Sequence, residues 1–89
     1  MLIEICRMNL DEAKKMGIDN WSSWSCEPSV FDWYYSEKET AYVYRGLVKV
    51  TPQGGQPVTI EGGMMAVFPK GMSCTWEVIE TIEKVYKFG

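Results

Sequence analysis

The stretch GMMAVFPKGMSC, residues 63–74, contains an apolar run, a turn and the start of a second apolar run. The five apolar residues 64–68 predict a short buried strand. Pro69 and Gly71 predict a sharp turn after it, because proline fixes φ and glycine accepts positive φ. A second strand then begins near Cys74, whose side chain could be a metal ligand, a nucleophile or a small packing residue.

Strand character dominates the rest of the chain. Turn residues separate many of the segments, and strand starts recur about every 8–12 residues, which is typical of an antiparallel sandwich or barrel. The segments rich in β-branched and aromatic residues are 2–7, 30–35, 40–50, 57–60, 64–68, 73–79 and 82–88.

One short helix is predicted near the N-terminus, over the sequence NLDEAKKMGI. Asn9 suits the N-cap and Glu12 completes a capping box, whereas Gly17 is expected to end the helix. Leu10, Ala13 and Met16 share one face, which we expect to pack over an edge or end of the sheet.

Alternation along the strands predicts which side chains face the interior, because successive side chains of a strand point to opposite faces. The long strand must change parity around Arg45-Gly46 to keep its apolar residues inside, and a β-bulge would do this. The predicted inward residues are Phe31, Trp33, Tyr35, Glu39, Ala41, Val43, Val48, Val50, Cys74, Trp76, Val78, Ile82, Lys84, Tyr86 and Phe88.

Composition excludes several classes of function. The chain has 89 residues, enough for one domain over 1–89, and no histidine, which excludes Ser-His and Cys-His dyads and histidine-ligated metals. A net charge of −3 without a basic run argues against nucleic-acid binding. No apolar stretch is long enough to span a membrane. Three widely spaced cysteines indicate reduced thiols, so we expect a cytoplasmic protein.

The residues that form the predicted turn resemble a motif of the cupin superfamily. Gly63, Pro69 and Gly71 have the spacing of the second cupin motif, and Cys74 stands where that motif has a metal-binding histidine. Glu39, seven residues before Gly46, matches the glutamate of the first motif. Trp33 and Tyr35 occupy the positions of that motif's two histidines, so this resemblance covers residues 33 to 78.

The resemblance implies an all-β, single-domain cupin β-barrel, an RmlC-like jelly roll, with one short N-terminal helix. The chain is similar to the small cupins grouped with ureidoglycine aminohydrolase and the ethanolamine-utilisation cupin. It keeps only Glu39 of the four metal positions, so the resemblance carries over no hydrolase activity. We therefore expect no metal and no cofactor.

Several predicted inward residues are candidates for a small-molecule site at the barrel mouth. Trp33, Tyr35, Trp76 and Tyr86 could line a ligand or only fill the core. Glu39 and Lys84 are the candidate catalytic pair, but each also suits a plain structural role at a turn or rim. Cys74 could line the same site, as a thiolate or as a small hydrophobe.

Three hypotheses of function follow. The first is metal-independent binding of a small metabolite, or weakly specific catalysis on it, at the barrel mouth. The second is a metal-dependent cupin enzyme that uses Glu39 and Cys74 as unusual ligands. The third is a non-catalytic interaction scaffold. We also expect a possible homodimer, because edge strands of a small open barrel tend to pair.

Overall fold

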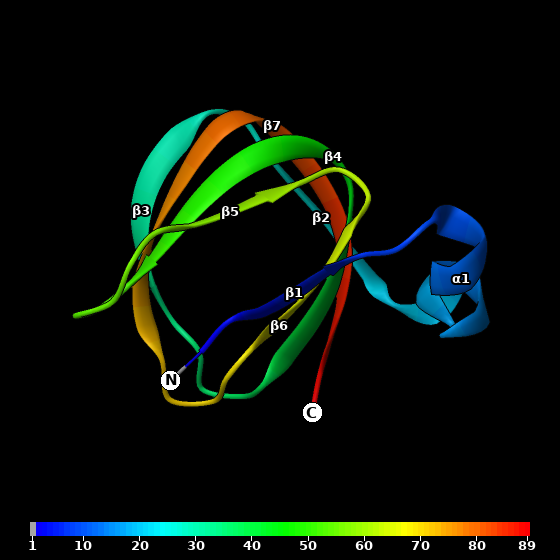
Figure 1. Cartoon of the computed structure of the whole chain (residues 1–89), viewed down its shortest axis with the longest axis horizontal. Coiled ribbons are helices and arrows are strands. Elements are labelled where there is room, and N and C mark those ends of the chain that lie inside the picture. The colour runs from blue at the N-terminus through cyan, green and yellow to red at the C-terminus, as the bar shows by residue number, and fades with distance from the viewer. Residues whose placement is uncertain (1) are drawn as a thin grey trace.

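The computed structural model describes residues 2–89 and shows a β-barrel with two short helical segments at one end (Figure 1). The elements, in chain order, are β1 (Glu4–Arg7), α1 (Leu10–Lys15), the 3₁₀ helix η1 (Ile18–Asn20), β2 (Ser22–Cys26), β3 (Ser29–Tyr34), β4 (Glu39–Pro52), β5 (Val58–Glu61), β6 (Met64–Phe68) and β7 (Ser73–Phe88). The predicted all-β class is confirmed.

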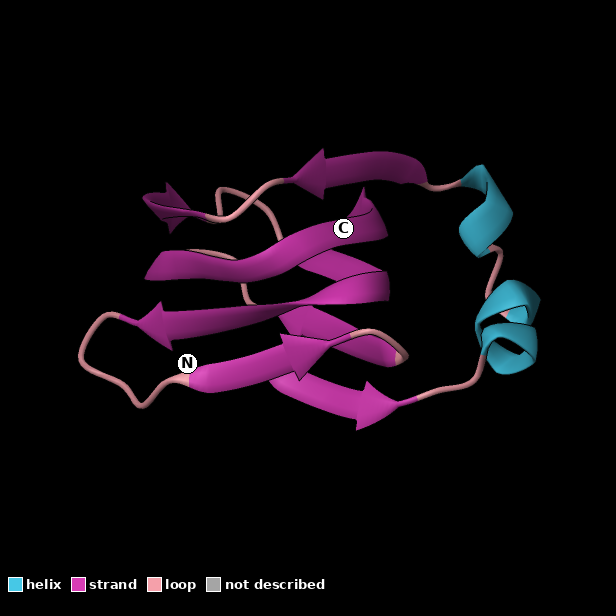
Figure 2. Cartoon of the chain, turned by 90° about the horizontal axis from the view of Figure 1, so that it is seen from above, coloured by secondary structure: helices cyan, strands magenta, loops and turns pink. Residues whose placement is uncertain are grey.

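Two long strands, β4 and β7, organise the barrel. They pair antiparallel along their length, from Glu39 opposite Phe88 to Pro52 opposite Cys74. At one end the strand order is β1-β6-β4-β7-β2, and at the other β5 flanks β4 while β3 flanks β7. Both long strands curve, so the seven strands of the sheet wrap around one core (Figure 1). Seen from above, the strands run across the barrel and the helical segments lie beyond one end of them (Figure 2).

The bend of β4 lies where the sequence requires a change of parity. The pairing with β7 shifts register between Val43 and Val48, and Gly46 there has a φ of 113°. A side chain at Gly46 would meet the backbone of β7, since its Cβ would lie 2.5 Å from the carbonyl oxygen of Thr81. The predicted bulge around Arg45-Gly46 is confirmed.

The strand predictions differ from the structure in two places. Segments 73–79 and 82–88 form the single strand β7, because the ladder with β4 continues across residues 80–83 without a turn. Strand β2 was not predicted at all. Its sequence SSWSC is rich in serine, yet Trp24 and Cys26 point toward the core while Ser23 and Ser25 are exposed.

The N-terminal helix has its predicted ends but not its predicted buried face. Asn9 and Glu12 form both hydrogen bonds of the capping box, and Gly17 has a φ of 88° just after the helix. Of the three residues assigned to the packing face, only Ala13 is buried, whereas Leu10 and Met16 are exposed. The helix has only six residues and lies outside the barrel (Figure 1), so it packs against the barrel through the small side chain of Ala13.

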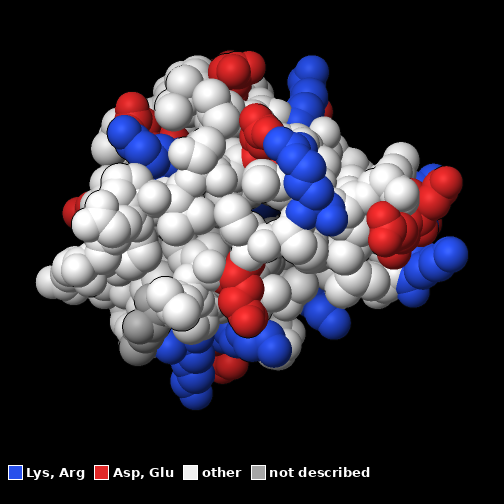
Figure 3. All heavy atoms as spheres, in the orientation of Figure 1, with Lys and Arg blue, Asp and Glu red and all other residues white. Residues whose placement is uncertain are grey.

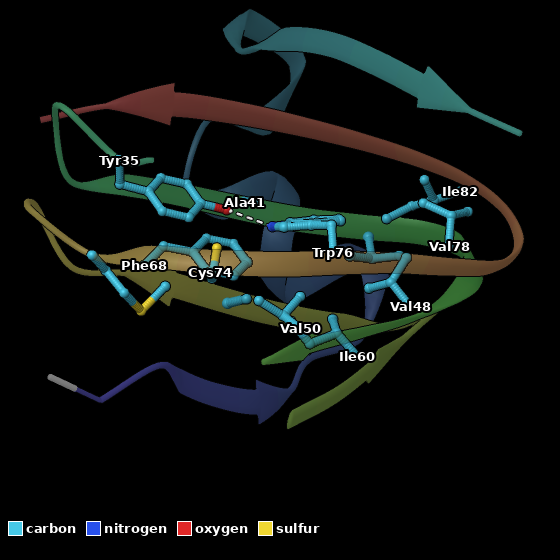
Figure 4. Packing of buried hydrophobic residues seen from close by; sticks show 13 residues of the cluster. Tyr35, Ala41, Val48, Val50, Ile60, Phe68, Cys74, Trp76, Val78 and Ile82 are labelled. Atoms are coloured by element: carbon cyan, nitrogen blue, oxygen red, sulfur yellow. Dashed lines mark hydrogen bonds between the residues drawn. The ribbon is translucent and has the colours of Figure 1, made fainter. Parts of the chain in front are cut away.

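Two apolar clusters hold the fold together. The smaller one joins the helical segments to the outside of the barrel through Ala13, Ile18, Tyr42, Met65 and Val85. The larger one fills the barrel (Figure 4) and consists of Tyr35, Ala41, Val43, Val48, Val50, Ile60, Ala66, Phe68, Met72, Cys74, Trp76, Val78 and Ile82.

The turn after Pro69 fixes the start of the candidate site. Gly71 has a φ of 86°, as predicted, and its N–H donates to the carbonyl oxygen of Tyr35 at 2.6 Å. The Tyr35 N–H in turn donates to Met72 at 2.9 Å. This turn therefore holds Tyr35, which follows β3, against the beginning of β7.

The outer surface carries charges of both signs. On the face shown in Figure 3, acidic and basic side chains are interspersed. Neither helical segment in residues 2–89 has the length and apolarity of a membrane-spanning helix.

Candidate functional site

A cavity of about 200 Å³ lies at the end of the barrel where β4 begins and β7 ends. Its walls are mostly aromatic, and two charged residues, Glu39 and Lys84, complete them. The aromatic residues come from four segments of the chain and are Trp24, Phe31, Trp33, Tyr35, Trp76, Tyr86 and Phe88. Trp33 and Phe88 are about half exposed, so they form the rim of the cavity.

Trp76 on β7 is the centre of the aromatic wall. Its ring stacks on Phe31, with ring centroids 6.1 Å apart, and meets the edge of Trp24 at 5.9 Å. The ring of Phe68 packs against Trp76 with a centroid distance of 5.8 Å and stacks on Tyr35 at 4.9 Å (Figure 4). Pairing with partners from three other strands leaves Trp76 little freedom to move, so the wall is preformed.

The Tyr35 hydroxyl is held by this wall. Trp76 donates its indole N–H to the hydroxyl oxygen at 3.2 Å, as Figure 4 shows. Burial, and then the nearby Glu39 carboxylate, raise the pKa of Tyr35 well above its usual range. The phenol therefore stays protonated, and its own proton has no acceptor among residues 2–89.

Glu39 and Lys84 form an ion pair inside the barrel. The Lys84 ammonium donates to Glu39 Oε2 at 2.6 Å, and the two side chains are only 7% and 5% exposed. Glu39 begins β4, whereas Lys84 lies opposite Val43 and Trp24 in the middle of its sheet. The long lysine side chain therefore runs toward the cavity end of the barrel to reach the carboxylate.

Aromatic rings surround the Lys84 ammonium on its other sides. Its nitrogen lies 4.8 Å from the ring centroid of Trp76, 5.0 Å from Trp24, 5.5 Å from Tyr86 and 5.8 Å from Phe68. Such cation–π contacts stabilise a desolvated cation. Burial still lowers the pKa of Lys84, and the Glu39 carboxylate opposes that shift.

Cys74 lies in the core but does not line this cavity. Its thiol is directed at the carbonyl oxygen of Trp33, 3.6 Å away on the neighbouring strand. Burial raises the pKa of the Cys74 thiol to about 11. A thiol in this environment is protonated at neutral pH and packs as a small hydrophobe.

Comparison with known proteins identifies the fold. Residues 13–86 match the model of the family described as EutQ-like cupin domain. This chain belongs to that family. The barrel is therefore the jelly roll of the cupins, as the sequence motifs predicted. No protein among curated sequences matches the chain.

Solved structures of similar cupins support the same assignment. A DUF861 family protein from Thermotoga maritima is 36% identical, with a TM-score of 0.94, over 99% of this chain and 100% of that one. The EutQ protein of Clostridium difficile is 19% identical, with a TM-score of 0.69, and a putative ethanolamine utilization protein Q from Salmonella typhimurium is 16% identical, with 0.65. The latter two likenesses cover 97% and 99% of this chain. The chain spans only 66% and 69% of those two proteins.

In this chain, the residues at the four positions where cupins bind a metal do not suit a metal ion. These positions are occupied by Trp33, Tyr35, Glu39 and Cys74. An indole is not a ligand, the Tyr35 hydroxyl accepts from Trp76, the Cys74 thiol is directed at the carbonyl oxygen of Trp33, and the carboxylate is already paired with Lys84. Stable sites need three or four protein donors in fixed geometry, and residues 2–89 contain no cluster of three such acidic or cysteine side chains.

Six of the seven predicted site residues line the cupin cavity, and Cys74 does not. Phe31 and Phe88 also line it; they were predicted to face inward but not to belong to the site. Trp24 was missed because β2 was missed. The alternation of serine with Trp24 and Cys26 is the signal that could have identified it.

Proposed function

We propose that this cupin is a metal-independent binding module for a small, largely apolar molecule. The observation that carries the proposal is the preformed aromatic cavity of about 200 Å³ with one buried ion pair in its wall. Binding sites for small molecules are typically apolar cavities with a few well-placed polar groups. An engineered apolar cavity of about 150 Å³ binds benzene, so this one has room for a single ring with a small substituent.

Glu39 and Lys84 are the polar anchors in this proposal. They would also be the acid–base pair if the bound molecule reacts, since a proton could pass between groups 2.6 Å apart. Trp33, Tyr35, Trp76 and Tyr86 are proposed to contact the apolar part of the ligand.

A fragment screen by thermal shift tests the proposal. A ligand that binds only the folded state stabilises it, by about 2.7 kcal/mol at a concentration of 100 Kd. Hits are then titrated against two variants of neighbouring residues. Trp33→Ala removes a side chain at the cavity rim, whereas Tyr34→Ala removes an exposed ring outside the cavity.

The two variants should separate binding in the cavity from binding elsewhere. We expect Trp33→Ala to weaken the hits at least tenfold and Tyr34→Ala to leave them unchanged. A screen without any stabilising fragment, or hits equally affected by both variants, would contradict a binding site in this cavity and favour the scaffold hypothesis.

A further inference from the structure

The cavity contains charged groups but has no net charge. Glu39 and Lys84 neutralise each other at 2.6 Å, and among residues 2–89 no other lysine, arginine, aspartate or glutamate lines the cavity. A ligand with a full charge would have to be desolvated here beside one group of its own sign. Burying such a charge without a partner of its own is strongly unfavourable.

The ion pair still leaves one hydrogen-bond acceptor free. Glu39 Oε2 accepts from Lys84, whereas Oε1 has no hydrogen-bond partner among residues 2–89. Within those residues no side-chain oxygen or nitrogen is both fully inaccessible and unpartnered. Glu39 Oε1 therefore retains some accessible surface, and Glu39 is one of the residues that line the cavity.

A free donor lies on the same wall. The Tyr35 hydroxyl accepts from Trp76, but its own proton has no acceptor in the described chain. The hydroxyl therefore has one O–H donor to offer, and the tyrosine lines the cavity together with Glu39. A ligand that satisfies both groups must donate one hydrogen bond to the carboxylate and accept one from the phenol.

We propose, on the basis of the binding function proposed above, that the ligand is an uncharged ring compound with one polar group that both donates and accepts a hydrogen bond. A primary carboxamide meets this description, because it has an N–H that can donate to a carboxylate oxygen and an oxygen that can accept from a phenol. The aromatic walls suit the ring by stacking and edge contacts.

Three probes of nearly equal size test this class. Benzamide is neutral, benzoate is an anion and benzylamine is a cation at pH 7, and each is titrated into the wild-type chain by calorimetry. Perturbation of the indole N–H signals of Trp24 and Trp76 in NMR spectra reports binding in the cavity. We expect benzamide to bind at least tenfold more tightly than either charged probe.

A charge change in the cavity should reverse this preference. In Glu39→Gln the wall has a net positive charge, so benzoate should become the strongest of the three probes. Glu77→Gln makes the same change on the outside of β7, where Glu77 pairs with Lys49 at 3.5 Å, and should keep the wild-type order. If the Glu39 variant fails to fold, the order of affinities of the three probes for the wild-type chain still tests the ligand class.

Each result has a defined meaning. A charged probe that binds most tightly in the wild-type cavity would overturn the ligand class but leave the proposed binding function intact. Absence of binding by all three probes at millimolar concentration would also overturn the ligand class. It would not overturn the proposed binding function, which the broader fragment screen tests. An unchanged order in Glu39→Gln, or a reversed order in Glu77→Gln, would show that the ion pair does not set the preference.

Discussion

Substitution of Lys84 by methionine should destabilise the fold strongly at neutral pH. At 2.6 Å the attraction that it removes is about 6 kcal/mol for an effective dielectric constant of about 20. Part of this loss is offset, because the lysine no longer has to be desolvated. What remains is a Glu39 carboxylate without a partner at 5% exposure.

Removing one partner of a buried ion pair typically costs about 3–5 kcal/mol, because it leaves an uncompensated charge in the interior. We therefore expect Lys84→Met to lose about 3–4 kcal/mol at pH 7.

Urea unfolding at pH 7 measures this loss. Lys49→Met is the matched control, because Lys49 pairs with Glu77 at 3.5 Å on the surface, with both side chains near 45% exposed. That variant should lose less than about 1 kcal/mol. The double variant Glu39→Gln/Lys84→Met should recover most of the loss. A Lys84→Met loss below about 1 kcal/mol would refute a buried charge pair.

Four further outcomes are expected. Asn9→Ala removes the capping box and should lower stability by about 1 kcal/mol in thermal unfolding. Gly46→Ala should lower the stability by at least about 2 kcal/mol. Gly54 also has positive φ but has open space around it, so Gly54→Ala should lower the stability less. Elemental analysis should find no stoichiometric transition metal; about one metal per chain, lost in Cys74→Ala or Glu39→Gln, would restore the metal-enzyme hypothesis. Sedimentation at micromolar concentration should show a homodimer, because β1 pairs only with β6 in the described chain and so has a free edge; a monomer would contradict this.

The fold was predictable because its signals are local. Gly63 lies in the turn before β6, and Pro69 and Gly71 lie in the turn after it, so these residues mark both ends of that strand. The bulge was predictable for a different reason. The apolar residues before Gly46 and those after it have opposite parity, and only an irregularity in the pairing of β4 with β7 lets both groups face the interior.

Most of the residues that line the cavity were predicted to face inward, but the shape of the cavity was not predictable. Alternation placed Lys84 inside with its apolar neighbours, and the motif placed Glu39 inside, so an ion pair was one of the possibilities. Nothing in the sequence decides whether an inward lysine reaches a partner or the solvent. That depends on the direction in which the side chain extends across the sheet. Lys84 lies opposite Val43, but its ammonium reaches the carboxylate of Glu39, four residues before Val43.

The missed strand β2 changes the interpretation of the whole cavity. Without Trp24 the lysine would face solvent on one side, and the ion pair would lie at an open rim where it contributes little. The ring lies directly opposite Lys84 in the sheet and 5.0 Å from its ammonium. This contact closes the cavity wall. The serine-rich strand β2 has little strand propensity of its own, yet it is what buries the Glu39–Lys84 ion pair. The electrostatic character of the site therefore depends on a tertiary contact, and strand propensity carries no information about it.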